Sequence, residues 1–188
     1  MTIEPTALPE VLEITPDRFS DERGWWTETW NHDAWAAARL PTRFVQDALS
    51  WSAPGVLRGL HLQVPRCQGK LVSVLAGEVF DVAVDVRAGS PTFGRWVGAT
   101  LSAANGKQVW IPPGFAHGFL VTGETDALFA YKCTEPYDAQ GQVAIRWDDP
   151  EIGIEWPAAP RSLSDRDRDA PGLRALSDLL PYLPSEPR

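Results

Sequence analysis

The stretch GKQVWIPPGFAHGFLV, residues 106–121, carries the pattern that decides the fold. It contains two short apolar segments, Gln108–Ile111 and Gly118–Val121, separated by the turn-forming sequence Pro112-Pro113-Gly114. The same alternation of short strands and turn residues runs through the middle of the chain. The expected strands are Phe44–Ser52, Val56–Gln63, Lys70–Leu75, Val79–Val86, Arg95–Leu101, Gln108–Ile111, Gly118–Val121 and Ala127–Cys133. Eight such strands without intervening helices predict an all-β fold, an antiparallel jelly-roll barrel.

Helix signals are confined to the flanks of this barrel. The alanine-rich segment His32–Leu40 and the leucine-bearing segment Gly172–Leu180 are both expected to form short helices. The tail Pro181–Arg188 is rich in proline and is expected to be poorly ordered. We therefore expect a single domain over residues 1–188, with an arm at about 1–43, the barrel at about 44–150 and a C-terminal segment at 151–188.

The expected arm is unusually aromatic. Four of the nine tryptophans of the chain lie in its first 35 residues: Trp25, Trp26, Trp30 and Trp35. A segment this apolar needs a surface to cover, which is either its own barrel or the barrel of a partner.

Composition narrows the class of protein. The chain has 188 residues with 44% hydrophobic and 22% charged residues, which is typical of a soluble globular domain with a real core. A net charge of −8 argues against nucleic acid as a partner, although a few placed cations can still hold a small anion. No apolar run reaches the roughly 18 residues of a membrane span, and the N-terminus lacks the pattern of a signal peptide. Cys67 and Cys133 can form one bridge at most, so we expect a cytoplasmic protein.

The three histidines are His32, His61 and His117. His32 falls in an expected helix and is expected at the surface. Residues 106–117 resemble the second cupin motif, and Gly55–His61 begins like the first. A metal-binding cupin would have another histidine at position 63 and a glutamate soon after, but position 63 is Gln63 and the next glutamate is Glu78. Because two histidines alone make a poor metal site, the sequence predicts a cupin barrel without a metal.

Several polar residues are expected to converge in the mouth of this barrel: Arg58, His61, Gln63, Lys70, His117 and Tyr131. They can form a binding site, or they can be rim charges and hydrogen-bonded core residues. Arg58 and His61 are three residues apart, so a regular strand would place them on opposite faces. A bulge at Gly59 would turn both side chains toward the pocket.

A longer series of motifs resembles one enzyme family. They are, in order, Asp21-Glu22-Arg23-Gly24, Phe44-Val45-Gln46-Asp47, Gly55–His61, Gln68-Gly69-Lys70-Leu71-Val72, Gly77-Glu78-Val79-Phe80-Asp81-Val82, Gly89-Ser90-Pro91-Thr92-Phe93-Gly94, Ile111–Phe119 and Leu163-Ser164-Asp165-Arg166-Asp167. Together they closely resemble the dTDP-4-dehydrorhamnose 3,5-epimerase family of nucleotide-sugar enzymes. The resemblance runs from about Val11 to Pro171, which is most of the chain.

This resemblance implies a dimeric cupin that inverts C3 and C5 of dTDP-4-dehydro-6-deoxyglucose without a metal or an organic cofactor. His61 is similar to the base of the family and Tyr131 to the acid on the opposite face of the sugar. Asp167 resembles the carboxylate paired with the base, and Lys70 the cation beside the sugar carbonyl. Substrate-contacting positions match Arg23, Glu28, Gln46, Arg58, Lys70, His117 and Arg166, and Tyr137 resembles the aromatic residue near the thymine. The strand with Arg23 and Glu28 crosses to the partner subunit in this family.

The residue types suit that chemistry. A proton next to a ketone becomes removable when the resulting enolate is stabilised, and histidine can act as the base near neutral pH. Lys70 would supply positive charge where the enolate oxygen develops. Guanidinium groups suit a diphosphate because they bind its oxygens in a fork. Asp81 is expected to point inward from its strand as a second polar partner near the base.

Four positions depart from the family pattern and keep alternatives open. Ala48 replaces an asparagine, Leu62 an aromatic residue, Gln142 a glutamate that usually contacts the nucleotide, and Trp26 a phenylalanine. These changes can alter the pose of the sugar, so the first alternative is an epimerase that inverts C3 or C5 only, in a secondary-metabolite pathway. A cupin that binds a nucleotide sugar without turnover and a metal-dependent cupin oxygenase are further alternatives.

Overall fold

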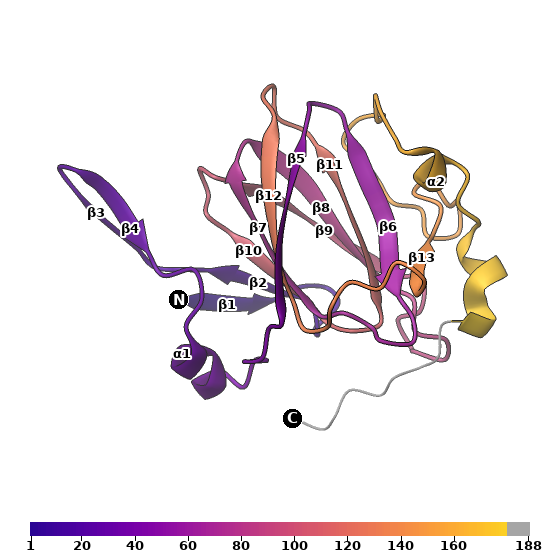
Figure 1. Cartoon of the computed structure of the whole chain (residues 1–188), viewed down its shortest axis with the longest axis horizontal. Helices are drawn as coiled ribbons and strands as arrows, with labels where there is room; N and C mark the ends of the chain where they lie inside the picture. Colours follow the sequence, from indigo (N-terminus) through magenta and orange to yellow (C-terminus); the bar gives the residue numbers. More distant parts are fainter. Residues whose placement is uncertain (180–188) are drawn as a thin grey trace.

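Two antiparallel sheets, stacked face to face, form the barrel (Figure 1). The structure is a computed structural model that describes residues 1–179. The six-stranded sheet has the order β1 (Thr2–Pro5), β2 (Leu12–Thr15), β10 (Gln108–Ile111), β7 (Lys70–Ala76), β12 (Ala127–Cys133) and β5 (Gln46–Ser52). The five-stranded sheet has the order β13 (Gln142–Ala144), β6 (Leu57–Gln63), β11 (Phe115–Val121), β8 (Glu78–Asp85) and β9 (Trp96–Ser102). Neighbouring strands pair antiparallel throughout both sheets, so the predicted jelly-roll architecture is confirmed.

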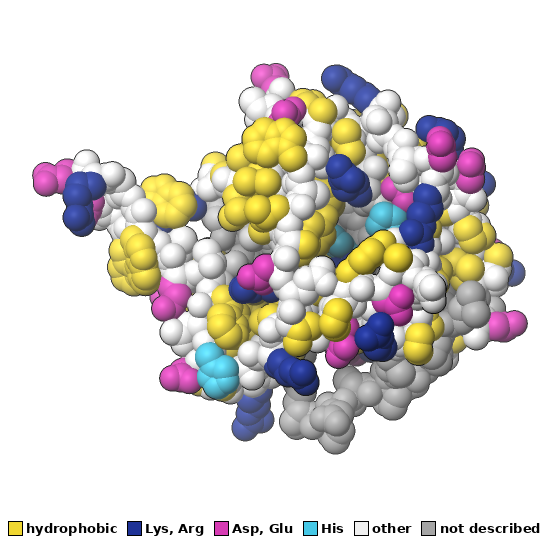
Figure 2. Space-filling view, in the orientation of Figure 1, with side chains coloured by type: hydrophobic (Ala, Val, Ile, Leu, Met, Phe, Trp, Pro, Cys, Tyr) yellow, Lys and Arg dark blue, Asp and Glu magenta, His cyan; other side chains and the backbone are white. Residues whose placement is uncertain are grey.

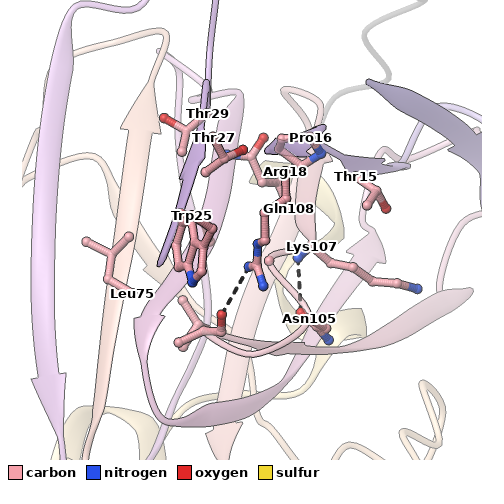
Figure 3. A pocket seen from close by; sticks show the side chains of 14 residues that line it. Thr15, Pro16, Arg18, Trp25, Thr27, Thr29, Leu75, Asn105, Lys107 and Gln108 are labelled. Carbon is pink, nitrogen blue, oxygen red and sulfur yellow. Dashed lines mark hydrogen bonds between the residues drawn. The ribbon is translucent and has the colours of Figure 1, made fainter. Parts of the chain in front are cut away.

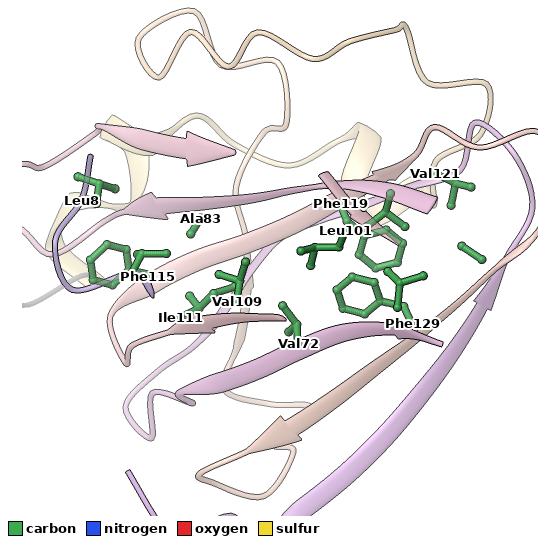
Figure 4. Close-up of a cluster of buried hydrophobic side chains, with 14 residues drawn as sticks. Leu8, Val72, Ala83, Leu101, Val109, Ile111, Phe115, Phe119, Val121 and Phe129 are labelled. Atoms are coloured by element: carbon green, nitrogen blue, oxygen red, sulfur yellow. The ribbon is translucent and has the colours of Figure 1, made fainter. Parts of the chain in front are cut away.

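Side-chain alternation along the strands builds the core between the sheets. Phe119 of β11 and Phe129 of β12 are both fully buried and stack with their ring centroids 4.3 Å apart (Figure 4). Burial of such a ring contributes about 1.5–3 kcal/mol, so this stack is a main contact between the layers. Two residues along the same strands, His117 and Tyr131 face the same interior, with ring centroids 6.2 Å apart. The interior of the barrel therefore changes from apolar to polar over two residues, between Phe119 and His117 on β11 and between Phe129 and Tyr131 on β12.

The outer faces of the sheets are covered by the two flanks of the chain. On the six-stranded sheet, Trp35 of α1 (His32–Ala37) is buried beside Leu12, Ile14 and Trp110. Helix α1 begins after Asn31, whose side chain accepts a hydrogen bond from the backbone N–H of Ala34. On the five-stranded sheet, the C-terminal segment buries an apolar cluster that includes Val82, Val84, Ile145, Ile152 and Leu173. This segment contains α2 (Asp165–Arg168) and a 3-10 helix, Leu173–Leu179.

All eight predicted strands are present, with small changes in their bounds. The largest change is in β11, which begins at Phe115 because the turn closes at Gly114 and Phe115 already pairs with Asp85. The helix predicted over His32–Leu40 ends at Ala37, and the one predicted over Gly172–Leu180 is the 3-10 helix. Leu180 and the tail Pro181–Arg188 lie outside the described residues. The strands β1–β4 and β13 and the helix α2 were not predicted.

The first 43 residues divide into parts that cover this barrel and a part that stands apart. Strands β1 and β2 complete the six-stranded sheet, and Trp30 and Trp35 pack in an aromatic cluster against it. The hairpin of β3 (Arg18–Asp21) and β4 (Gly24–Thr27) pairs only with itself and projects from the barrel (Figure 1). Its aromatic residues Phe19, Trp25 and Trp26 are exposed.

The base of this hairpin is attached through Arg18. Its guanidinium donates to the backbone oxygens of Ala103 and Ala104 and lies 4.2 Å from the ring centroid of Trp25. These contacts form one side of a cavity of about 270 Å³ between the hairpin and the barrel (Figure 3). The opposite face of the hairpin, with Phe19 and Trp26, has no such contact with the barrel among the described residues.

Candidate active site

The site is built around an irregularity in β6. Along β11, His117 pairs with His61 and Phe119 pairs with Arg58, so two residue steps on β11 span three on β6. This is the predicted bulge, and Gly59 lies in it with φ +127°. A Cβ at Gly59 would lie 2.5 Å from the Cα of Gly118, so the backbone needs glycine here. The bulge allows Arg58 and His61 to line the same two cavities.

His61 is paired with a carboxylate from the other end of the chain. Its Nε2 lies 2.6 Å from Oδ1 of Asp167, whose side chain is 4% exposed, against 25% for His61. The backbone N–H of Gly59 donates to the other oxygen of this carboxylate. Burial alone would raise the pKa of Asp167, but the hydrogen bond and charge of His61 and the bond from Gly59 lower it below its ordinary value. Asp167 therefore stays ionised, and Nε2 of His61 carries the proton between them.

Tyr131 faces His61 from the opposite sheet. It belongs to β12 of the six-stranded sheet, and both residues line the same cavities, of about 530 and 180 Å³. Its hydroxyl shares a hydrogen bond with Ser50 of β5 at 3.3 Å. Burial raises the pKa of Tyr131 to about 12, so the hydroxyl keeps its proton at neutral pH. The cavity is thus bordered by an imidazole on one side and a protonated phenol on the other.

Lys70, the first residue of β7, places a cationic side chain at the smaller cavity. Lys70 is buried, and among residues 1–179 no carboxylate lies within ion-pair distance of its ammonium group. Burial lowers the pKa of Lys70, and nearby Cys133 and Asp81 oppose that shift. A buried cation without an ion pair is costly, which is typical of a group kept for binding or catalysis.

His117 and Asp81 form a second buried pair, 2.7 Å apart between Nε2 and Oδ2. Asp81, expected as a second polar partner near the base, is hydrogen-bonded to His117, which pairs across the sheet with His61. The sheet order gives the reason, because β11 with His117 lies between β8 with Asp81 and β6 with His61. Burial lowers the pKa of His117, while the charge of Asp81 and the hydrogen bond to it act in the opposite direction.

The remaining edge of the cavities carries groups suited to a ligand with anionic and aromatic parts. Arg58, Gln142 and Arg166 line the larger cavity, and Gln46, Gln142 and Tyr137 line the smaller one. Gln46 accepts a hydrogen bond from the backbone N–H of Tyr137 at 2.6 Å, which holds this exposed ring at the mouth. Figure 2 shows the result as a hollow with histidine at its floor and cationic side chains at its rim.

Three candidate residues lie elsewhere. Arg23 is on the projecting hairpin, ion-paired with Asp21, and Glu28 follows β4, and neither residue lines the two cavities. Gln63 is buried, but its amide donates to the backbone oxygens of Arg66 and Pro136 and accepts from the N–H of Asp138. Gln63 therefore supports the neighbouring loops. Within residues 1–179 no group of three or more His, Cys, Asp and Glu side chains is arranged to hold a metal ion.

Comparison with known proteins assigns this chain to a family. Residues 5–175 match the family model described as dTDP-4-dehydrorhamnose 3,5-epimerase. The chain belongs to this family. A protein of that name from Pseudomonas aeruginosa is 52% identical over 164 residues, which cover 86% of this chain and 90% of that protein. One from Neisseria gonorrhoeae is 54% identical over 158 residues, or 84% of this chain, and these cover 48% of its length. The chain therefore spans about half of the Neisseria protein.

A solved structure supports the epimerase fold of the chain. A dTDP-6-deoxy-D-glucose-3,5-epimerase of Legionella pneumophila, in complex with dTDP-4-keto-L-rhamnose, superimposes with a TM-score of 0.94. It is 48% identical and covers 98% of this chain and 99% of that one. A dTDP-4-dehydrorhamnose 3-epimerase of Streptomyces niveus is more distant, at 38% identity over 90% of this chain and 83% of that protein. The chain is an isomerase of the epimerase family, and its similarity is higher to these double epimerases than to this single-position one.

Three further residues of this epimerase were missed in the sequence. Ser50 binds the hydroxyl of Tyr131, Ser52 accepts from Nε of Arg58, and Ser164 accepts from the backbone N–H of Asp167. For Ser164 a signal existed, because Ser164-Asp165-Arg166-Asp167 has the form of a helix N-cap followed by an acidic third residue. Ser50 and Ser52 carry no such signal, since only the strand pairing brings them to the site.

Proposed function

We propose that this chain inverts C3 and C5 of dTDP-4-dehydro-6-deoxyglucose to give dTDP-4-dehydro-L-rhamnose. The observation that carries the proposal is the placement of the His61–Asp167 pair and Tyr131 on opposite sides of one cavity. Inversion needs removal of a proton from one face of a carbon and return of a proton to the other. Both carbons flank the same ketone, so one set of groups can act on each in turn.

His61 is the base in this proposal. Because Nε2 is engaged by Asp167, the free nitrogen Nδ1 accepts the proton next to the ketone. The ionised Asp167 fixes this tautomer and stabilises the imidazolium that forms. Its burial matters, since a carboxylate with little exposure holds the ring in one orientation.

Lys70 and Tyr131 complete the proton transfer. Removal of the proton places negative charge on the ketone oxygen, and the ammonium of Lys70 is the buried cation that can stabilise it. Tyr131 then donates its proton to the opposite face of the carbon, which its raised pKa of about 12 permits because the hydroxyl is protonated at neutral pH. The pair of His117 and Asp81 lies beside this path and contacts the substrate through His117.

The remaining candidates hold the nucleotide. Arg58 and Arg166 are the guanidinium groups at the larger cavity and would bind the diphosphate, while Gln46 and Tyr137 would hold the thymine end. The proposed site uses no metal and no organic cofactor. Binding without turnover is disfavoured, because a base, an acid and a buried cation have no purpose in a site that only binds.

The working unit is proposed to be a homodimer that exchanges the β3–β4 hairpins. Arg23 and Glu28 have no contact with the cavities of their own chain, whereas the family resemblance assigns them to the substrate. A hollow of about 590 Å³ on the outer face of the six-stranded sheet, lined in part by the exposed Leu49 and Leu75, offers a receiving surface. No nucleic acid or membrane takes part, and the proposed location is the cytoplasm. Within residues 1–179 no helix is long and apolar enough to cross a membrane.

The test is solvent exchange with the purified protein. The substrate is incubated in heavy water without any reductase, and deuterium at C3 and C5 is counted by NMR. Label at both carbons, with the inverted product, supports the proposal. Label at one carbon moves the chain to the single-position class, and no label in the presence of tight dTDP binding reduces it to a binding protein.

A further inference from the structure

The two guanidinium groups at the larger cavity, those of Arg58 and Arg166, donate hydrogen bonds to neutral oxygens. Arg58 donates to Ser52 Oγ and to the backbone oxygen of Trp51. Arg166 donates from Nη1 and Nη2 to the side-chain and backbone oxygens of Gln142. Neither cation is ion-paired among the described residues, whereas Arg168 is paired with Asp165 at 2.6 Å. Two uncompensated positive charges thus stand at one cavity of a chain whose net charge is −8.

Gln142 connects one of these cations with the aromatic ring at the mouth. Its side-chain oxygen accepts from Arg166 and also from the hydroxyl of Tyr137, at 3.2 Å. Gln142 is held in place by β13, where it pairs with Gln63 of β6, the strand that also carries His61. The side chain therefore fixes Arg166 and Tyr137 relative to the reacting groups and borders both cavities.

A neutral side chain at this position has an electrostatic consequence. An amide oxygen can orient a guanidinium without cancelling its charge, whereas a carboxylate would form an ion pair and place a negative charge beside an anionic ligand. The amide nitrogen of Gln142 has no hydrogen-bond partner among residues 1–179, so it also offers a donor that a carboxylate lacks. Glutamine at this position therefore leaves the mouth one charge unit more positive than glutamate would.

We propose that Gln142 is a positioning residue that holds Arg166 at the mouth while leaving its charge available to the substrate diphosphate. This inference rests on the proposed function, since it assumes a nucleoside diphosphate sugar as the ligand. Gln142 then influences how tightly the nucleotide binds and how that affinity depends on salt, and it takes no part in proton transfer.

The test compares Gln142→Glu with Gln140→Glu. Gln140 is exposed, lies two residues earlier and lines neither cavity, so its substitution adds the same charge outside the site. Binding of dTDP is measured by calorimetry at low and high salt, and KM and kcat with the keto sugar. For Gln142→Glu we expect dTDP affinity to fall about fivefold at low salt and KM to rise in parallel, because the new carboxylate cancels the charge of Arg166. The loss should shrink at high salt, while kcat changes by less than about twofold.

A third variant separates charge from hydrogen bonding. Gln142→Met removes the bonds to Arg166 and Tyr137 without adding charge, so its loss of affinity should be smaller and independent of salt. The inference is overturned if Gln142→Glu binds dTDP as tightly as Gln140→Glu, or if its kcat falls while dTDP affinity is unchanged. Failure of the wild-type chain to exchange deuterium would instead contradict the proposed function, so the two failures are distinguishable.

Discussion

His61 and Asp167 meet at 2.6 Å although 106 residues separate them along the chain. The contact depends on the C-terminal segment, which returns across β6 and is tied to it by a hydrogen bond from the N–H of Leu57 to the oxygen of Ser162. Ser164 then begins α2 and presents Asp167 in its first turn. The proposed base on β6 is therefore oriented by a segment that covers the opposite face of the same sheet.

Replacing this carboxylate tests its role in orienting the base. Asp167→Asn keeps the size of the side chain but can leave His61 in the wrong tautomer, so kcat should fall by about 10²- to 10⁴-fold. Affinity for dTDP should be unchanged, because both carboxylate oxygens of Asp167 are engaged within the protein, by His61 and by the backbone N–H of Gly59. Steady-state kinetics and calorimetry check this, and a variant with near wild-type kcat would remove Asp167 from the mechanism.

The same pair makes a prediction for stability against pH. The pKa of Asp167 is lower in the folded chain than in an unfolded one, so its ionised form stabilises the fold. This contribution is fully present above the unfolded pKa of about 4 and is lost as the pH falls through the lower folded value. Melting temperatures measured from about pH 7 to pH 3 should therefore fall more steeply for wild type than for Asp167→Asn. Parallel curves would contradict the assignment.

Tyr131→Phe should separate proton removal from inversion. His61 can still remove a proton and return deuterium to the same face, so label should enter the sugar while inversion is nearly abolished. Stability should change by less than about 1 kcal/mol, because the lost hydrogen bond to Ser50 is a single neutral one. NMR of the product distinguishes labelled substrate from labelled epimer. Retained inversion at wild-type rate would assign the acid elsewhere.

Lys70 offers a prediction in which activity and stability move in opposite directions. Because burial lowers its pKa, the charged form of Lys70 is less favourable in the folded chain than in the unfolded one. Lys70→Met removes this cost, so the melting temperature should rise, while kcat falls by about 10²-fold or more through loss of the charge near the enolate. The stability gain should diminish above about pH 10, where an unfolded lysine is also neutral. A drop in melting temperature at pH 7 would contradict the argument that the buried charge of Lys70 destabilises the fold.

The sequence predicted the central strands because Gly and Pro mark their ends and apolar residues fill them. It did not predict β13 or α2, which have only three and four residues and depend on tertiary contacts with β6. Strands β1 and β2 were assigned to an arm, although the alternation that buries Leu12 and Ile14 is visible in the sequence.

For the site, the local sequence pattern predicted the placement of single residues better than it predicted which residues contact each other. The position of Gly59 between Arg58 and His61 indicated where a bulge would turn both side chains toward the pocket, because the strand period is fixed at two. The partner of Asp81 was not predictable, since it follows from the order of strands in the sheet and not from spacing along the chain. The contact of His61 with Asp167 entered only through the family resemblance, as no local rule connects residues so far apart.

The bulge itself can be tested with a matched pair of glycines. Gly59 and Gly24 have nearly equal φ values of +127° and +129°, but a Cβ at Gly24 would meet nothing within 4 Å. Both alanine variants incur the backbone cost of about 1–3 kcal/mol, and only Gly59→Ala adds the clash with Gly118, about 1–3 kcal/mol more. Chemical denaturation should therefore show the larger loss for Gly59→Ala. Equal losses would mean that the bulge can move to accommodate a side chain.

The proposed exchange of hairpins between subunits predicts that two inactive variants restore each other. Arg23→Ala should remove nearly all activity of the partner's site, because Arg23 lies on the projecting hairpin and lines no cavity of its own chain. His61→Ala should abolish activity in its own barrel. In a mixed dimer one site carries both changes and the other carries neither. When an equal mixture is unfolded and refolded, about half of the dimers are mixed, and each of these has one intact site of two. The mixture should therefore recover about a quarter of wild-type activity. Each variant refolded alone is the control. If the mixture stays as inactive as its components, Arg23 acts in its own barrel or not at all, and the hairpin does not complete the partner's site.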